Sequence, residues 1–144
     1  MKKILISLLI VLLMAGCGTA APATPVEKTA SYKGEPMEDG SYITVDLTMT
    51  DDKISKIDID EYYAKKQAFK DDLKDDYGIK SDKGDWYKQV EGLEKYLVGK
   101  TLDDVKAMTF DEKGHSTDAD VLTVCTIGTS EIITAVIAAI GEAK

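Results

Sequence analysis

Residues 42–60 read YITVDLTMTDDKISKIDID, and their pattern decides the fold. Between Ile43 and Met49 apolar residues alternate with polar ones, and the alternation returns at Ile57 and Ile59. A period of two is typical of a strand that buries one face. A short polar segment joins the two runs, so the stretch predicts an antiparallel β-hairpin.

Two details bear on where this hairpin begins and how regular it is. Asp39-Gly40 comes just before the first strand, and we expect the folded domain to begin there. Ile54 is out of phase with Ile57 and Ile59. The second strand should therefore start after Ile54 or carry a β-bulge.

Helical periodicity follows the hairpin. A middle helix that opens at Asp85 is predicted from apolar residues at intervals of three and four, namely Trp86, Val90, Leu93 and Leu97. Gly99 is a suitable residue to end it. Thr101-Leu102-Asp103-Asp104 resembles a capping box and predicts a short helix.

The last element is a helix from about Thr129 to Glu142. Its apolar face is formed by Ile132, Ile133, Val136, Ile137 and Ile140. Between the clear elements, residues 62–76 are interpreted as a weak helix ending at Gly78, and residues 108–111 as a third strand. Together the elements predict an α+β fold, in which a small antiparallel sheet starting with the hairpin packs against the middle helix and the C-terminal helix.

The chain begins MKKILISLLIVLLMAGC. Two lysines precede a run from Ile4 to Met14 that is apolar except for Ser7, and two small residues precede Cys17, which is the layout of a secretory signal peptide. The cysteine after small residues resembles the lipobox of bacterial lipoproteins. By that resemblance the chain is cut before Cys17, acylated there with chains such as palmitate, and held outside the cytoplasm on the bacterial cell membrane. One alternative is an ordinary cleaved signal with an incidental cysteine. Another is a short membrane-spanning helix, but such a helix needs about 20 apolar residues and this run is shorter.

This interpretation divides the chain into three parts. Residues 1–16 are the predicted signal peptide, residues 17–38 a lipidated cysteine with a flexible tether, and residues 39–144 the folded domain. The tether is inferred from Pro22, Pro25 and Pro36 among small and polar residues.

Composition excludes several classes of function. The net charge of −8 is unsuited to nucleic-acid binding through general electrostatics, so no nucleic acid is expected as a partner. Without arginine, a phosphate site must use lysine, hydroxyls or backbone N–H groups. His115 is the only histidine, and Cys125 is the only cysteine besides Cys17, which excludes a zinc site built on several such ligands. A binding protein or electron carrier is therefore expected rather than an enzyme. With one histidine and one cysteine besides Cys17, the chain has few residues that could form a catalytic nucleophile and its base.

The segment 118–131, DADVLTVCTIGTSE, carries the most suggestive chemistry. Four hydroxyl residues gather just before the closing helix: Thr123, Thr126, Thr129 and Ser130. A helix N-terminus offers N–H groups and partial positive charge to an anion, and Gly128 lets backbone approach a ligand closely. The alternatives are that Thr129 or Gly128 simply caps the helix, and that residues 121–127 form a buried strand.

The order of these segments resembles the FMN-binding domain of bacterial exported flavoproteins. The runs WYKQ at 86–89 and LEKYLVGKT at 93–101 are similar to the lipoprotein subgroup called major membrane immunogen. The similarity covers most of residues 39–144.

The resemblance implies an FMN site on a known motif. In that family, Asp-x-x-Ser/Thr-Gly-Ala-Thr-x-Ser/Thr carries FMN, and the threonine after Gly-Ala can be esterified to the flavin phosphate by a flavin transferase. The residues implied to hold FMN here are Asp120, Thr123, Thr126, Gly128, Thr129 and Ser130, with Thr126 as the esterified hydroxyl. Val124 stands in place of the glycine, Cys125 in place of the alanine, and Gly128 in place of the last hydroxyl.

Two functions are consistent with these observations. The first is a membrane-anchored extracytoplasmic lipoprotein that carries FMN for electron transfer, with a flavin transferase and membrane redox proteins as partners. The second is a non-redox surface lipoprotein that keeps the same fold as a binding or structural module, which Val124 in place of glycine suggests.

Overall fold

The structure, a computed structural model, describes residues 24–144. The predicted signal peptide and Cys17 lie outside the described residues. The strands are β1 (Glu27–Lys33), β2 (Tyr42–Thr50), β3 (Lys53–Tyr63), β4 (Ala68–Phe69), β5 (Lys80–Ser81) and β6 (Gly84–Asp85). The helices are α1 (Lys70–Leu73), the 3₁₀ helix η1 (Lys74–Tyr77), α2 (Trp86–Leu97), α3 (Leu102–Lys106), α4 (Ala119–Val124) and α5 (Ser130–Glu142).

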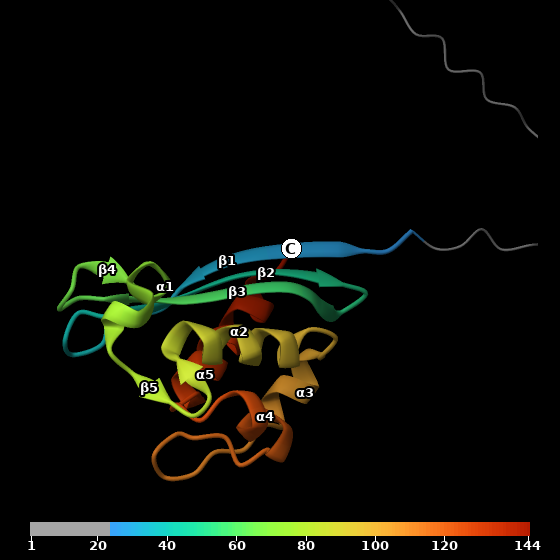
Figure 1. Cartoon of the computed structure of the whole chain (residues 1–144). Helices are drawn as coiled ribbons and strands as arrows, with labels where there is room; N and C mark the ends of the chain where they lie inside the picture. Colours follow the sequence, from blue (N-terminus) through green and yellow to red (C-terminus); the bar gives the residue numbers. More distant parts are fainter. Residues whose placement is uncertain (1–23) are drawn as a thin grey trace, which may run out of the picture.

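An antiparallel sheet in the order β1-β2-β3-β4 covers one side of the domain, and α2 and α5 lie on one of its faces (Figure 1). Helix α5 packs on β1 and β2, while α2 packs on β3. The core between the two layers is formed by strand residues such as Val45 and Ile59 and helix residues such as Leu93 and Val136. The predicted α+β class is confirmed.

The central hairpin has the predicted form. Strands β2 and β3 pair antiparallel, and the apolar residues of both strands face the core. The register shifts between Thr48 and Met49, so that Met49 pairs with Ile54. This irregularity is the expected β-bulge, and it lets Ile54 be buried on the same face as Ile57.

The expected tether is wrong between residues 27 and 33, because this stretch forms the edge strand β1. It pairs with β2 from Glu27 opposite Thr50 to Lys33 opposite Thr44. An edge strand needs little apolar surface, and here only Lys28, Ala30 and Tyr32 are half-buried. The described domain therefore begins before residue 39. Nine residues separate Cys17 from β1, a reach of about 30 Å at most.

Three local predictions are also wrong. Residues 62–76 form no single helix, since β3 continues to Tyr63 and is followed by β4, α1 and η1, although Gly78 does end the segment. Residues 108–111 form no strand, and Phe110 makes only a single bridge to Ser116. Residues 121–124 belong to α4 rather than a buried strand, because Asp118 caps a helix there.

The helix predictions hold elsewhere. Helix α2 spans the predicted face, and Gly99 follows it with a positive φ. Thr101 and Asp104 form the capping box of α3. Helix α5 begins at Ser130, one residue later than expected, and ends at Glu142 as expected. Between residues 24 and 144, no helix is both long enough and apolar enough to cross a membrane.

Candidate functional site

The predicted site residues lie on one continuous segment, which runs from helix α4 through a short loop into helix α5. Asp120 and Thr123 are on α4, and Thr126 and Gly128 are in the connecting loop. Thr129 is the N-cap residue of α5, and Ser130 is its first helical residue. The fold thus brings the six residues into one region, between α2 and the loop at residues 111–116.

Helix α4 is held at its N-terminus by Asp118. One carboxylate oxygen of Asp118 accepts the N–H of Asp120 at 2.8 Å, and the other accepts the hydroxyl of Tyr96 at 2.7 Å. The Tyr96 hydroxyl lowers the pKa of Asp118, while burial together with this carboxylate raises the pKa of Tyr96 to about 12. The Thr123 hydroxyl donates to the carbonyl of Asp120 at 2.6 Å, so it is engaged within its own helix.

Thr126 is bound by a buried glutamine of helix α2. Its N–H and its hydroxyl both donate to Oε1 of Gln89, at 2.9 and 3.2 Å. The amide nitrogen of Gln89 donates to the Gly84 carbonyl and to the Ser81 hydroxyl. Gln89 is fully buried, whereas Thr126 is half-buried in its loop. The polar side chain of Gln89 therefore fixes the loop that carries Thr126.

The N-terminus of α5 is closed by the carbonyl of Gly114. That oxygen accepts the N–H groups of Thr129 and Ser130, at 2.8 and 3.1 Å. Gly114 has φ +80°, and a Cβ there would lie 2.5 Å from Ser130 Oγ, so the loop can approach this closely only with glycine. The side chain of Thr129 caps nothing, and its hydroxyl is buried without a partner among the described residues.

These contacts decide how a flavin phosphate could be held. A free phosphate at the start of α5 is disfavoured, because the Gly114 carbonyl already accepts two of the N–H groups there and the acidic Glu131 stands in the first turn. A phosphoester on Thr126 requires the hydroxyl to give up its bond to Oε1 of the buried Gln89. Thr126 lies in a loop and is half-buried, and its N–H bond to Gln89 does not depend on the hydroxyl proton.

The departures from the motif have a structural explanation. Val124 packs against Gly92 of α2, where an added Cβ would lie 2.8 Å from Val124 Cβ. Val124 has no positive φ, so its place in α4 requires no glycine. Cys125 is a free, buried cysteine, and burial raises the pKa of its thiol, which disfavours the reactive thiolate.

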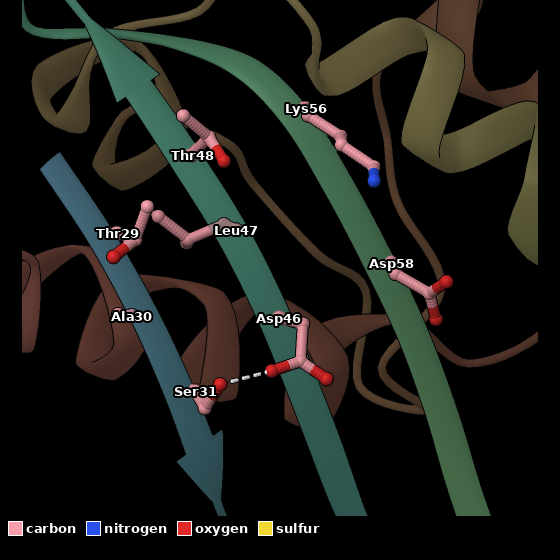
Figure 2. A pocket seen from close by; sticks show the side chains of 8 residues that line it. All are labelled: Thr29, Ala30, Ser31, Asp46, Leu47, Thr48, Lys56 and Asp58. Carbon is pink, nitrogen blue, oxygen red and sulfur yellow. Dashed lines mark hydrogen bonds between the residues drawn. The ribbon is translucent and has the colours of Figure 1, made fainter. Parts of the chain in front are cut away.

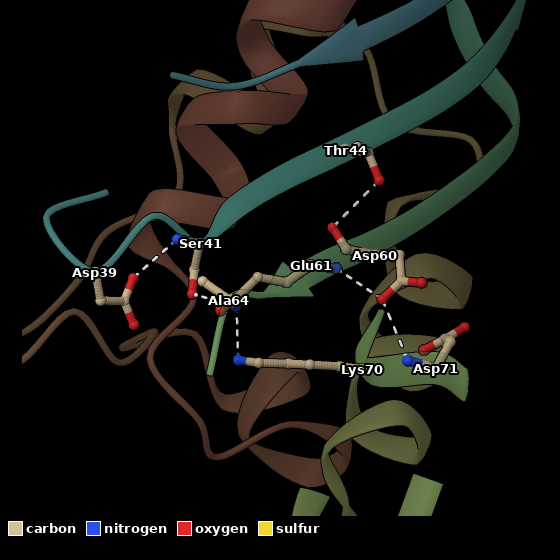
Figure 3. A network of polar contacts seen from close by, with 8 residues as sticks. All are labelled: Asp39, Ser41, Thr44, Asp60, Glu61, Ala64, Lys70 and Asp71. Atoms are coloured by element: carbon tan, nitrogen blue, oxygen red, sulfur yellow. Dashed lines mark hydrogen bonds and ion pairs between the residues drawn. The ribbon is translucent and has the colours of Figure 1, made fainter. Parts of the chain in front are cut away.

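A second polar cluster joins residues of β3 and α1 (Figure 3), and Trp86 at the start of α2 lies beside it. Lys70 is buried, forms a 2.7 Å ion pair with Glu61, and faces the rings of Tyr77 and Trp86. Asp60 accepts the N–H groups of Glu61 and Asp71. Trp86 is thus a core residue in contact with a lysine, consistent with its place on the predicted apolar face of α2.

Two carboxyl groups around this cluster have pKa values well above the ordinary ones. Burial, reinforced by the neighbouring acids, raises the pKa of Asp71 to about 6 and that of Glu94 to about 7. Glu94 accepts the N–H of Ile59 at 2.6 Å and so closes part of the outer edge of β3. Within residues 24–144, no group of three or more His, Cys, Asp or Glu side chains is arranged to hold a metal ion.

Sequence reasoning missed Gln89 and Gly114. Gln89 sits between Trp86 and Val90 on the apolar face of α2, and a polar residue at that position was a usable signal. Gly114 acts through its backbone carbonyl alone, so no side-chain pattern could have shown it. Lys70 was also missed, because its segment was interpreted as a weak helix and nothing in that pattern marks this lysine as buried.

The comparisons with known proteins bear on the fold. No protein-family model and no curated protein sequence matches the chain. A search of solved structures finds similarity to a Clostridium thermocellum protein whose solution NMR structure was determined by the Northeast Structural Genomics Consortium. The two share 24% identity, with a TM-score of 0.51 over 83% of this chain and 92% of the other. At this level of identity the likeness shows the fold alone.

Proposed function

We propose that this chain is an extracytoplasmic lipoprotein, anchored to the bacterial membrane through acylated Cys17, whose domain carries FMN as a phosphoester on Thr126 for electron transfer. The anchor is inferred from the signal-peptide pattern and the cysteine that follows it. Two or three acyl chains give stable attachment, which one chain does not.

The observation that carries the flavin proposal is the position of Thr126. Among the threonines of the segment, Thr123 is engaged within α4 and Thr129 is fully buried. Thr126 alone of these three lies in the loop between two helices; it is half-buried, whereas Thr123 is exposed on α4. The choice of Thr126 as acceptor therefore rests on its place in the loop and in the motif, and not on greater exposure.

The residues of this chain have a limited part in the attachment. The Thr126 hydroxyl oxygen would form a P–O bond to the flavin phosphate as the phosphoanhydride bond of a flavin dinucleotide donor breaks; the nucleoside monophosphate would leave, and the hydroxyl proton would pass to a base of the transferase. Gln89 keeps the Thr126 N–H bond throughout and so holds the loop in place. When attached, FMN supplies the one- and two-electron redox chemistry, and the short connection to Cys17 keeps it near redox proteins of the membrane.

A second candidate function is favoured by a different observation. The loop that carries Thr126 is paired within the chain, since Gln89 accepts both donors of Thr126 and the Gly114 carbonyl accepts the N–H groups of Thr129 and Ser130. A lipoprotein that keeps this fold without flavin, as a binding or structural module, needs nothing more from these residues.

In-gel flavin fluorescence separates the two candidates. The full chain is expressed with a flavin transferase, extracted from membranes and run on a denaturing gel. We expect a fluorescent band for the wild type and for Thr129→Val, and none for Thr126→Val. The Thr126→Val protein keeps the N–H bond to Gln89, so its fold provides a fair comparison.

Two results would contradict the flavin proposal. One is a dark wild-type band in a host where another acceptor protein is labelled. The other is equal fluorescence of the wild type and Thr126→Val. The non-redox candidate is contradicted instead if the purified chain retains flavin on the gel.

A further inference from the structure

Strand β1 is the outer edge of the sheet and pairs only with β2 within it (Figure 1). Gly34 donates to the Ile43 carbonyl at 2.8 Å, which identifies the residues whose backbone faces β2. In an antiparallel ladder the alternate residues turn their N–H and C=O groups the other way. Thr29 is one of these, and it exchanges hydrogen bonds of 3.1 and 3.3 Å with Lys144.

Ser31 and Lys33 are the next outward positions along this edge. Their outward backbone groups have no partner among residues 24–144. Figure 2 shows that the Ser31 hydroxyl is directed to Asp46 on the neighbouring strand. The Lys33 ammonium lies 3.9 Å from the centre of the Tyr42 ring. Both side chains therefore leave the backbone edge accessible.

Two hollows flank this edge, beside opposite ends of helix α5. The first, of about 250 Å³, has an apolar floor that includes Tyr32, Met37, Ile43 and Ala135. The second, of about 500 Å³, lies between residues 29–31 and the end of α5 at Gly141. Lys144 lines the second hollow and already occupies the outward edge at Thr29, so an extended chain added to β1 would pair at Ser31 and Lys33 and place its side chains in the first hollow.

The charge around the first hollow indicates what could occupy it. Glu35 and Glu131 both line it and are exposed, while Lys33, the cation of this part of the edge, has its ammonium over the Tyr42 ring. The two glutamates favour a segment in which lysine or arginine stands next to an apolar side chain. A second copy of this chain is disfavoured, because each copy has a net charge of −8.

We propose that the outward edge of β1 at Ser31 and Lys33, with the hollow beside α5, is a docking site for an extended basic and apolar segment of a partner protein. The segment adds to the sheet as a further strand, its backbone pairing with β1 and an apolar side chain entering the hollow. This site is separate from Thr126, so it stands whether or not the chain carries flavin.

The test uses a peptide of alternating lysine and valine with blocked ends as the probe, and the full chain in detergent micelles. Backbone amide NMR should show slowed hydrogen exchange at Ser31 and Lys33 when the peptide binds. A control peptide has the same side chains but is N-methylated at two adjacent central residues, so each of its edges is blocked. It should bind about tenfold more weakly, because strand pairing loses its donors.

A matched pair of protein variants tests the charge argument. The double variant Glu35→Gln, Glu131→Gln should weaken peptide binding about fivefold, whereas Glu91→Gln, Glu112→Gln, which removes two exposed acids that do not line the hollow, should change it little. The proposal is overturned by equal affinity for the methylated peptide, by unchanged exchange at Ser31 and Lys33, or by equal effects of the two variants. It is also overturned if the chain alone forms dimers that protect this edge.

Discussion

Gln89 is the residue that connects helix α2 to the candidate site. It is fully buried, and all of its hydrogen-bonding capacity at Oε1 goes to Thr126. A buried polar group left without its partner costs about 1–3 kcal/mol. The loop between α4 and α5 therefore depends on a side chain 37 positions away in the sequence.

Replacing Gln89 with leucine should destabilise the domain by about 2–4 kcal/mol, because Thr126 and the Gly84 carbonyl lose their buried partner. Urea unfolding followed by circular dichroism measures the change. The control is Thr126→Val, which removes only the hydroxyl and should cost about 1 kcal/mol or less. Equal effects of the two substitutions would contradict the role given to Gln89.

Removing the hydroxyl of Thr129 should stabilise the domain, whereas replacing Gln89 should destabilise it. The Thr129 hydroxyl is buried, caps nothing and has no partner among the described residues. Thr129→Val keeps the shape and removes the unpaired group, so unfolding free energy should rise by about 1 kcal/mol. A loss of stability in the same urea experiment would mean that this hydroxyl has a hydrogen-bond partner in solution.

At the scale of elements, the close contact between α2 and α4 depends on Gly92. An added Cβ at this position would lie 2.8 Å from Val124 Cβ and 3.3 Å from the Val124 carbonyl. Gly92→Ala should therefore destabilise the domain by about 1–3 kcal/mol, despite the better helix propensity of alanine. Thermal unfolding measures the effect.

Gly141 of α5 provides the matched control for that substitution. An added Cβ there meets nothing within 4 Å. Gly141→Ala should raise stability by about 0.5–1 kcal/mol through helix propensity alone. If both alanine variants were stabilised, α2 and α4 would not be in the contact described.

Some elements could be predicted from sequence and others could not, for physical reasons. Strands β2 and β3 and helices α2 and α5 each bury a whole apolar face, so their periodicity is visible. Strand β1 buries only parts of Lys28, Ala30 and Tyr32, and pairing with β2 creates it. Helix α4 runs through β-branched residues because Asp118 and the contact with Gly92 outweigh local propensity.

The candidate site divides in the same way. Its residues could be found from the clustering of hydroxyls before α5, and the fold does bring them together. The hydrogen-bond partners of these residues could not be predicted from sequence, because Gly114 contributes a backbone carbonyl from another loop and Gln89 comes from another helix. The distinction between a free phosphate and an ester on Thr126 needs those partners.

At the scale of the whole molecule, stability should depend on pH through the carboxylates between β3, α1 and α2. Burial raises the pKa of Glu94 to about 7 and of Asp71 to about 6, from ordinary values of 4.5 and 3.8. A raised pKa means that the folded domain holds the proton more tightly than the unfolded chain does. The stabilisation is therefore present near pH 4 and is lost as the pH rises through 6 to 7.

The melting temperature should accordingly be higher at pH 5 than at pH 8. Glu94→Gln keeps an oxygen for the Ile59 N–H and removes the titration, so the difference between the two pH values should shrink and stability at pH 8 should rise. Asp71 is exposed and should contribute less. Glu112→Gln in an exposed loop serves as the control, and an equal effect there would contradict this account.

The whole account depends on what is covalently attached to the native chain. The most direct measurement is the intact mass of the protein extracted from its own membranes, before and after phosphodiesterase treatment. We predict an acylated N-terminal cysteine at residue 17 and one FMN less a water, with the flavin mass removed by the enzyme and mapped to Thr126. A chain that carries the lipid but no flavin, from membranes in which other proteins are flavinylated, would contradict it.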